Sequence, residues 1–245
     1  RRPPRSTLSS SSAASDVYKR QRNNVSQLSK YISHRVIDEY DVVRATLGVS
    51  TFERAEKFIQ EVFWRVYWKG WLEHRPTVWS DFVAFDQQDK LSSQKDNKNY
   101  LAAINGETGI ECFDFWAHEL RNTNYLHNHA RMWFASIWIF TLGLPWQAGA
   151  QFFLKHLLDG DAASNTLGWR WVAGIQTMGK CYLARAENIS KFTGERFEDA
   201  RLNERALPLV DEKVHVVQPI DYAVSYTHLR AHETREDIVW RLLVD

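Results

Sequence analysis

Hydrophobic residues recur at helical intervals after Ser50, where the chain reads STFERAEKFIQEVFWRVYWKGWLEHRP. This spacing predicts an amphipathic helix over residues 51–72 that ends before Pro76. Ser50 and Glu53 have the spacing of a capping box at its start. The repeating apolar positions are Ala55, Phe58, Ile59, Val62 and Val66.

Similar patterns predict helices along most of the chain. The further predicted ranges are 23–47 (a helix pair), about 114–124, 125–143 and 146–158. Gly143 is a suitable C-cap, and Pro145 follows it. Residues 86–99 are rich in Asp, Lys, Asn and Ser and predict one long polar loop, whereas alternating β-branched residues occur only over 213–217. The predicted fold class is all-α.

Composition favours an ordinary globular protein. The chain has 245 residues, of which 44% are hydrophobic and 25% charged. No apolar run is long enough to span a bilayer, so we expect a soluble protein with no membrane partner. Cys112 and Cys181 are too few for a disulfide scaffold or a four-thiolate metal site, which fits the cytoplasm. Aromatic residues make up 13% and include eleven Trp, so some rings are expected to face a ligand.

The two ends differ from the middle and resemble translated adapter or vector sequence. Residues 1–22 carry six Arg or Lys and one Asp, and residues 225–245 carry three Arg and four acids. Without them, residues 23–224 have a formal net charge of −3, so DNA binding would need a local basic patch. The expected organisation is a disordered tail over 1–22, a helical domain over 23–200, an extension over 201–224 and a second tail over 225–245.

A stripe of one carboxylate and three indoles follows the first long helix. Glu61, Trp64, Trp68 and Trp71 occur at i, i+3, i+7 and i+10, opposite the aliphatic face. Two interpretations stay open. The helix is either buried on both sides, with Glu61 paired to an arginine, or it lines a ring-walled cavity with one polar anchor.

The HNHARM segment places Asn128, Arg131 and Met132 on one helix face. His127 and His129 are two residues apart and point in different directions, so they cannot chelate one metal ion, and no metal site is predicted. From spacing alone, Arg131 is either a buried ion-pair partner or a ligand contact.

An oxygen-rich segment, LLDGDAASNTLGWRW, contains Asp159, Asp161 and Asn165. It lacks the Gly and Glu of a calcium loop, since Ser164 and Arg170 hold those positions. Its acids suit either helix capping or a polar ligand with hydroxyl and ring N–H donors. No GxGxxG, GxxxxGK[ST] or GxSxG motif occurs, so Rossmann, P-loop and α/β-hydrolase chemistry lack support.

Six segments in order, NVSQLSKYISHR, EVFWRVYW, GETGIECFD, LHNHARM, LPWQAGAQFF and LLDGDAASNTLGWRWVAG, resemble the FAD-binding helical domain of DNA photolyases and cryptochromes. The resemblance spans residues 24–197. It implies FAD as cofactor and a family N-terminal α/β antenna domain that is missing here, through truncation or membership of a shorter branch. The implied cofactor contacts are Ser26, Leu28, Ser29, Arg65, Asn128, Arg131, Asp159, Asp161 and Asn165, with Val25 in place of the family's Thr.

The resemblance also implies roles within that set. Arg131 would pair with Asp159, and Asn165 would face flavin N5. The implied substrate cavity comprises Glu61, Trp64, Met132 and Trp171, a pattern of enzymes that repair cyclobutane pyrimidine dimers in DNA. A dimer must be flipped out of the duplex to reach such a cavity.

Glu61 and Asn165 are the catalytic candidates, Glu61 by hydrogen-bonding the dimer. The alternatives are a cryptochrome-like blue-light photoreceptor without repair activity and an inactive flavin-binding fragment.

In the family, a chain of three Trp carries electrons to the flavin. Trp169 and Trp146 match the inner two, but Phe85 stands at the outermost position and is too hard to oxidise. Other exits are open, and the candidate residues are Tyr100, Trp116, Trp133 and Trp138. After WVAG the chain departs from the family, so DNA contacts do not transfer there. Cationic residues in this stretch that could form a DNA-binding patch are Lys180, Arg185, Lys191 and Arg196.

Overall fold

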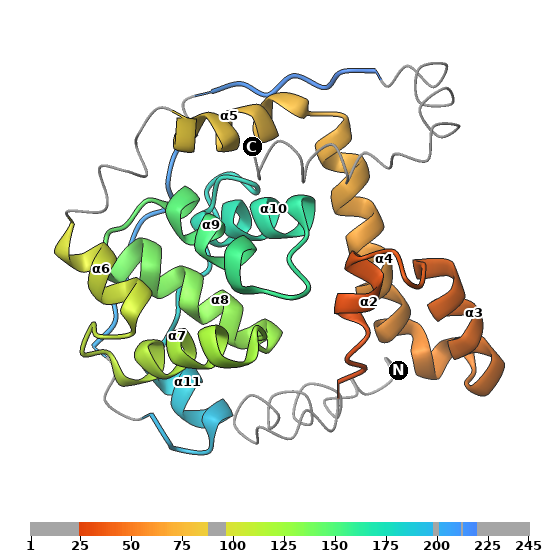
Figure 1. Cartoon of the computed structure of the whole chain (residues 1–245), viewed down its shortest axis with the longest axis horizontal. Coiled ribbons are helices and arrows are strands. Elements are labelled where there is room, and N and C mark those ends of the chain that lie inside the picture. Colours follow the sequence, from red (N-terminus) through yellow and green to blue (C-terminus); the bar gives the residue numbers. More distant parts are fainter. Residues whose placement is uncertain (1–24, 88–96, 198–200, 212, 220–245) are drawn as a thin grey trace, which may run out of the picture.

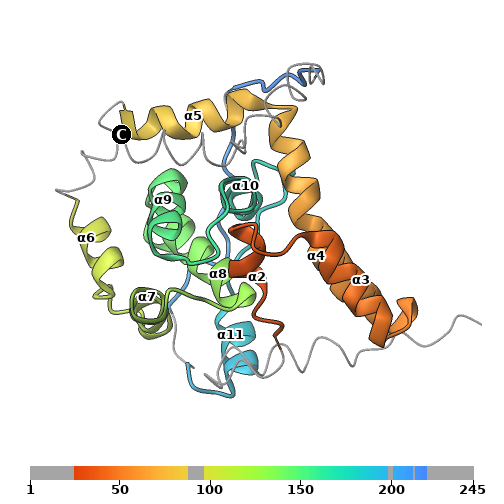
Figure 2. The same cartoon turned by 45° about the vertical axis from the view of Figure 1, so that its right-hand side comes forward.

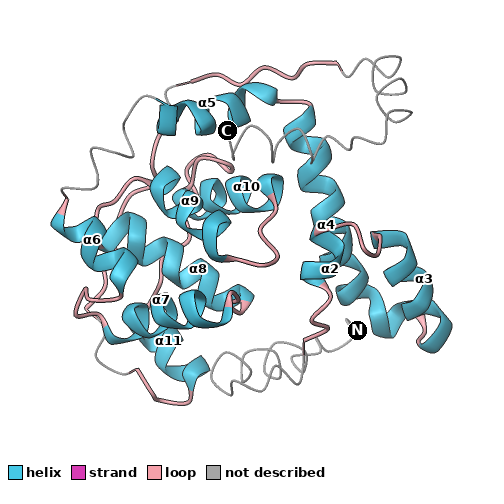
Figure 3. Cartoon of the chain, viewed as in Figure 1, coloured by secondary structure: helices cyan, strands magenta, loops and turns pink. Residues whose placement is uncertain are grey.

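A computed structural model describes residues 25–87, 97–197, 201–211 and 213–219. Within these ranges the regular elements are helices and no strand occurs, as Figure 3 shows, so the all-α prediction is confirmed. Both adapter-like tails, and most of the polar loop predicted over 86–99, lie outside the described residues.

Three N-terminal helices form one side of the molecule (Figure 1): α2 (Ser29–Ser33), α3 (Glu39–Val49) and α4 (Phe52–Glu73). The predicted pair over 23–47 and the long helix over 51–72 are thus present. Burial of Ile32, Val42 and Val62 holds them together. The capping box is wrong, because Thr51 is the N-cap residue of α4 and the Ser50 hydroxyl donates to the Thr51 carbonyl.

The remaining helices form the larger part: α5 (Pro76–Gln87), α6 (Lys98–Asn105), α7 (Glu111–Thr123), α8 (Asn128–Ser136), the π-helical η2 (Ile137–Thr141), α9 (Trp146–His156), α10 (Ala162–Ala173) and α11 (Ala186–Thr193). Their core is aromatic, and Trp116, Trp133 and Trp138 are fully buried. α10 lies between α9 and α4, as Figure 2 shows, and so joins the two parts.

The helix predicted over 125–143 is present from Asn128 to Thr141, but its last turn is π-helical. α8 begins at Asn128, and the Leu142 N–H donates to the Ile137 carbonyl, five residues back, in the π-helical turn. Four consecutive apolar side chains from Ile137 to Phe140 are buried here, so periodicity could not reveal the change.

The sequence pattern predicts no helix after residue 158, so α10 is a finding of the structure. It is covered on several sides and its sequence lacks a polar stripe, so the helical period is weak. Its N-cap residue is Asp161, whose carboxylate accepts from the Ser164 N–H at 2.8 Å. Helices α5, α6 and α11 were not predicted either.

Residues 201–211 and 213–219 form an irregular strap across the helices, so the strand-like pattern over 213–217 does not correspond to a strand. The strap's backbone is bonded to helix ends instead of to another strand. The Leu209 N–H donates to Ala173 O at 2.9 Å, and the Gln218 N–H donates to His74 O at 2.7 Å. The Arg170 guanidinium on α10 also bonds Asp211 at 2.7 Å.

Within the described ranges, no helix combines the length and apolar character needed to cross a membrane. The same residues contain no group of three or more His, Cys, Asp or Glu placed to hold a metal ion.

Gly149 on α9 packs directly against the Trp169 ring, and an added Cβ would also lie 2.9 Å from Trp138 Nε1. We therefore expect Gly149→Ala to destabilise the fold by about 1–3 kcal/mol through overpacking. Gly70→Ala is the matched control, because Gly70 lies in α4 with nothing within 4 Å and alanine favours the helix. Thermal melting of both variants checks this, and equal melting temperatures would contradict it.

Candidate functional site

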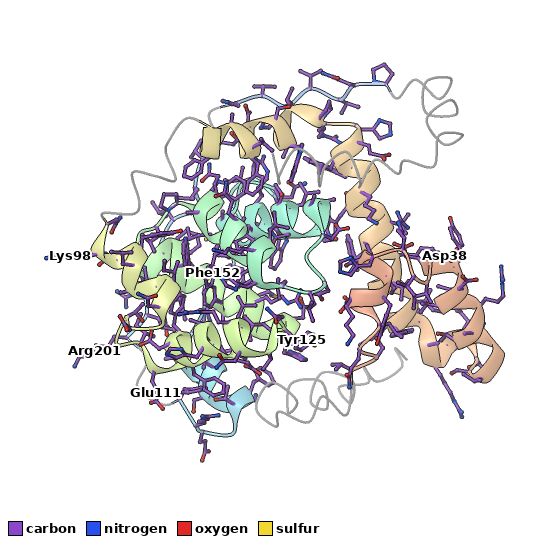
Figure 4. The ribbon with its side chains drawn as sticks, viewed as in Figure 1. Asp38, Lys98, Glu111, Tyr125, Phe152 and Arg201 are labelled. Atoms are coloured by element: carbon purple, nitrogen blue, oxygen red, sulfur yellow. The ribbon has the colours of Figure 1, made fainter. Side chains whose placement is uncertain are left out.

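A buried ion pair joins α8 to the connection between α9 and α10. Asp159 is 8% exposed, and Arg131 Nη2 donates to both of its carboxylate oxygens at 2.9 Å. Arg131 Nε also donates to Leu126 O, and its guanidinium lies 5.5 Å from the Tyr125 ring centre. Figure 4 labels Tyr125 beside α8, on the side towards α2. The implied pairing of Arg131 with Asp159 is therefore present.

Opposing effects act on the pKa of Asp159. Burial by itself raises this pKa, but the charge and hydrogen bonds of Arg131 outweigh it. The Ser29 hydroxyl and the Arg65 charge act in the same direction as Arg131. The pKa of Asp159 is held below its usual range, so the carboxylate is the form that the fold stabilises.

A second cluster surrounds Asp161 at the start of α10. Its carboxylate lies 3.7 Å from Arg65 Nη1 and 3.6 Å from Lys69 Nζ, both on α4. Lys69 Nζ also lies 4.0 Å from the buried Glu39 carboxylate on α3. Arg65 and Lys69 are one helical turn apart and share a face. Sequence reasoning found Arg65 and Asp161 but missed Lys69 and Glu39, although the four-residue spacing from Arg65 was a usable signal.

The Ser33 hydroxyl connects the two clusters. It accepts from Arg65 Nη1 at 2.8 Å and donates to Asp159 O at 2.9 Å. Ser33 ends α2, so this helix is fixed against both α4 and the α9–α10 connection. Ser33 also escaped sequence reasoning, since nothing in its local pattern marks it.

Residues in this region suit a flavin with a diphosphate. Arg65, Lys69 and Arg131 are partly buried cations that pair with the Asp161 and Asp159 carboxylates, and cations of this kind are also suited to binding phosphate oxygens. Asn165 Nδ2 donates to Ala150 O at 2.8 Å, which leaves its Oδ1 as the acceptor side for a ring N–H. The Ser164 hydroxyl is buried and has no hydrogen-bond partner among the described residues. An unused buried donor on a residue whose N–H is bonded to the Asp161 carboxylate fits a bound polar ligand.

Other implied cofactor contacts are more peripheral. The Leu28 N–H donates to Ser26 Oγ at 3.4 Å, in the stretch preceding α2. Leu28 also lines an apolar groove of about 560 Å³ between α2 and α3. Asn128, the first residue of α8, is exposed. Five of the implied cofactor residues thus belong to the connected polar clusters, namely Ser29, Arg65, Arg131, Asp159 and Asp161. Ser26, Leu28 and Asn128 lie at the edge of this region.

The implied cavity walls come from three packed helices. Trp64 on α4 is 48% exposed and stacks on Trp68, whereas Trp171 on α10 is 37% exposed and stacks on Tyr182. Met132 on α8 is half-buried. These rings are therefore available on the surface and are not filling a core.

Glu61 excludes one of the two interpretations of the α4 stripe and leaves the ring-walled cavity as a prediction. Its residue is exposed, and no ion pair joins it to an arginine within the described part of the chain. A helix buried on both sides, with Glu61 paired, is therefore wrong. Surrounding protein still desolvates the carboxyl group enough to raise its pKa above the ordinary value.

The residues aligned with the family's electron carriers lie in the hydrophobic core. Trp169 and Trp146 are buried, and Phe85 belongs to the main core.

The expectation that His127 and His129 point in different directions is wrong. His127 is the extended N-cap residue of α8, outside the regular helix, and its ring accepts from the His129 N–H at 3.3 Å. The two rings stack with centroids 5.4 Å apart.

The cationic residues proposed for a patch are all exposed, on α11 and the segments that flank it. They are Lys180, Arg185, Lys191 and Arg196.

The pKa of Asp159 is lower in the folded protein than in the unfolded chain. The ionised carboxylate therefore stabilises the fold at pH values above the unfolded-state pKa, and this stabilisation is lost as the pH falls through the folded-state pKa. We expect Asp159→Asn to cost about 3 kcal/mol near pH 7, since it leaves Arg131 uncompensated. The deficit should shrink below about pH 4, where an unfolded aspartate is protonated. Urea unfolding across this pH range measures it. Asp38→Asn, which retains a helix cap, is the control, and a deficit independent of pH would contradict the assignment.

The chain is similar to known photolyases in sequence. Residues 58–205 match the model of the FAD binding domain of DNA photolyase. The deoxyribodipyrimidine photo-lyase of Vibrio cholerae is 28% identical over 183 residues, which cover 72% of this chain and 38% of that protein. The chain therefore spans well under half the length of this relative.

Solved structures show the same likeness. A bacterial class III photolyase from Agrobacterium tumefaciens aligns with a TM-score of 0.58 and 26% identity, over 75% of this chain and 42% of that one. A Synechocystis cryptochrome shares the fold, with a TM-score of 0.55 and 22% identity over 75% of this chain and 40% of that one. The chain belongs to the photolyase/cryptochrome family, of which it carries the FAD-binding helical domain, and its cofactor is FAD.

Proposed function

We propose that this domain uses FAD for the light-driven repair of cyclobutane pyrimidine dimers in DNA. The observation that carries the proposal is the pair of exposed indoles, Trp64 and Trp171, presented by helices that also hold the cofactor-site residues Arg65 and Asn165. Large exposed rings are suited to stacking on unpaired bases.

The chain's own residues have separate parts in this function. Arg131, Arg65 and Lys69 hold the cofactor, and Asn165 presents its amide oxygen to a ring N–H. The raised pKa of Glu61 favours the protonated carboxyl group. In that form Glu61 donates a hydrogen bond to a carbonyl of the dimer. Bound FAD supplies the photoexcited electron, and the protein orients the reactants and excludes water.

The exposed cations on α11 and its flanks contact the DNA in this proposal. Residues 23–224 have a net charge of −3, which does not attract the DNA phosphates, so binding needs a local group of cations. An antenna domain, if the full protein has one, is a separate part of it. The free thiols of Cys112 and Cys181 suit the reducing cytoplasm, where the DNA substrate is found.

FAD retention tests the cofactor site. Arg131→Ala should leave purified protein depleted of flavin, since the buried Asp159 loses its partner at a cost of about 3–5 kcal/mol. Flavin absorbance per protein is the measurement. Arg44→Ala, which removes an exposed guanidinium on α3, should retain the cofactor. Wild-type protein that stays colourless after incubation with FAD would refute the cofactor assignment.

Damage preference tests the substrate. With flavin chemically reduced, the chain should bind single-stranded DNA containing a dimer more tightly than undamaged DNA and should split the dimer under blue light. Trp171→Ala should remove the preference, since ring stacking contributes about 1–3 kcal/mol per base. Its flavin spectrum should not change. Tyr40→Ala, which truncates an exposed ring on α3, is the control.

Reduced, flavin-loaded protein with neither damage preference nor dimer splitting would rule out repair. A photoreceptor function would then replace it if light changes the protein's shape or partner binding.

A further inference from the structure

The last part of the strap is attached to the helices through polar side chains. Residues 213–219 belong to the blue trace at the outer edge of the molecule, beside α5 in Figure 1. Lys213 pairs with Asp81 on α5, and His215 Nδ1 is hydrogen-bonded to the Thr77 hydroxyl, also on α5, at 2.9 Å. The side chains that hold this segment against the helices are therefore polar.

The side chains between them are apolar and face solvent. Val214 is 88% exposed and Val216 is 66% exposed, and they alternate with Lys213 and His215, as neighbours on opposite faces of an extended chain do. Val217 is exposed as well. An extended segment with one solvated face normally turns its apolar side chains inwards and its polar ones to water. This segment has the reverse arrangement, which is typical of a surface that another protein covers.

The backbone of this segment has no strand partner. Among the residues that the structure describes, the N–H groups of residues 214–217 find no acceptor. The segment is nevertheless fixed on both sides, by the pair between Asp211 and Arg170 and by the hydrogen bond from the Gln218 N–H to His74 O. Extended β-branched residues with unpaired backbone groups are a template to which another strand adds. Because this template is already held in place, pairing has a small ordering cost.

The charge of the segment indicates the kind of partner. Lys213 is paired with Asp81, and Asp211 with Arg170, so both charges are compensated within the chain. Residues 214–217 contain no Lys, Arg, Asp or Glu. An uncharged row of valines is not suited to nucleic acid, whose binding depends on cations. It can meet an identical row without repulsion between like charges.

We propose that residues 213–217 pair as antiparallel strands with the same residues of a second copy of this chain and so form a homodimer. A two-fold axis at His215 places Val214 opposite Val216 of the second copy, and Val216 opposite Val214. These cross-strand pairs of β-branched side chains stabilise the ribbon. None of these residues belongs to the cofactor or substrate site, so the proposal is independent of the function proposed above.

Sedimentation velocity of the full chain over a wide range of protein concentrations tests the proposal. Wild-type protein should pass from monomer to dimer as its concentration rises. V214K/V216K places lysines opposite lysines, so its dimer dissociation constant should rise about tenfold or more. V36K/V49K is the matched control, because it adds the same charge at two exposed valines in the N-terminal part and should dimerise as the wild type does.

A charge-reversed variant tests the antiparallel register. V214E/V216E by itself should dimerise as weakly as V214K/V216K, since like charges again lie opposite each other. An equimolar mixture of the two variants should form a heterodimer, because every Lys then lies opposite a Glu. Melting temperatures of all variants should match that of the wild type, since the substituted side chains are exposed.

A wild-type chain that stays monomeric at every concentration would overturn the proposal, and so would a V214K/V216K variant that dimerises normally. Loss of the dimer in V36K/V49K would assign the contact to the N-terminal helices instead. A mixture of the Lys and Glu variants that stays monomeric would overturn the paired-strand arrangement. Slow amide hydrogen exchange of residues 214–217 in the monomer would show that the chain covers this segment itself, which would also overturn the proposal.

Discussion

The ion pair between Arg131 and Asp159 is the interaction on which the geometry of the site depends. It fixes α8 against the connection between α9 and α10, and the Ser33 hydroxyl, bonded to the Asp159 carbonyl, adds α2. An uncompensated charge in the protein interior is costly, so any arrangement that separates these groups is strongly disfavoured. The pair therefore positions three chain segments that are distant in sequence.

Helix α10 connects this polar centre to the aromatic interior. It begins at Asp161, which attracts Arg65 and Lys69 from α4, and it ends against the strap at Arg170 and Ala173. Trp169 and Trp171, two residues apart, point in different directions along it. One ring is buried against Trp138 and the other is exposed beside Tyr182, so the same short helix serves both the core and the outer face.

The strap over residues 201–211 and 213–219 is integral to the domain although it lacks regular structure. It contacts several helices, and these contacts include the pair between Lys213 and Asp81 on α5, the bond between Gln218 and His74 at the end of α4, and the bonds from Asn203 to η2. Asp211 accepts from Arg170, and so this segment sets the charge beside the Trp146 ring. An extension that looks peripheral in sequence thereby affects the environment of a buried aromatic.

By itself the sequence determined the helical class and the long helix over 51–72, because periodicity is a local property, and its short motifs pointed to Arg65, Arg131, Asp159 and Asp161 of the two polar clusters. It did not reveal α10, whose buried faces leave little polar contrast, or the π-helical turn after α8. Only the tertiary structure showed that Ser33, Lys69 and Glu39 join the polar clusters and that Trp169 meets Trp138. These contacts join residues far apart in the chain and depend on how helices pack, which no local pattern records.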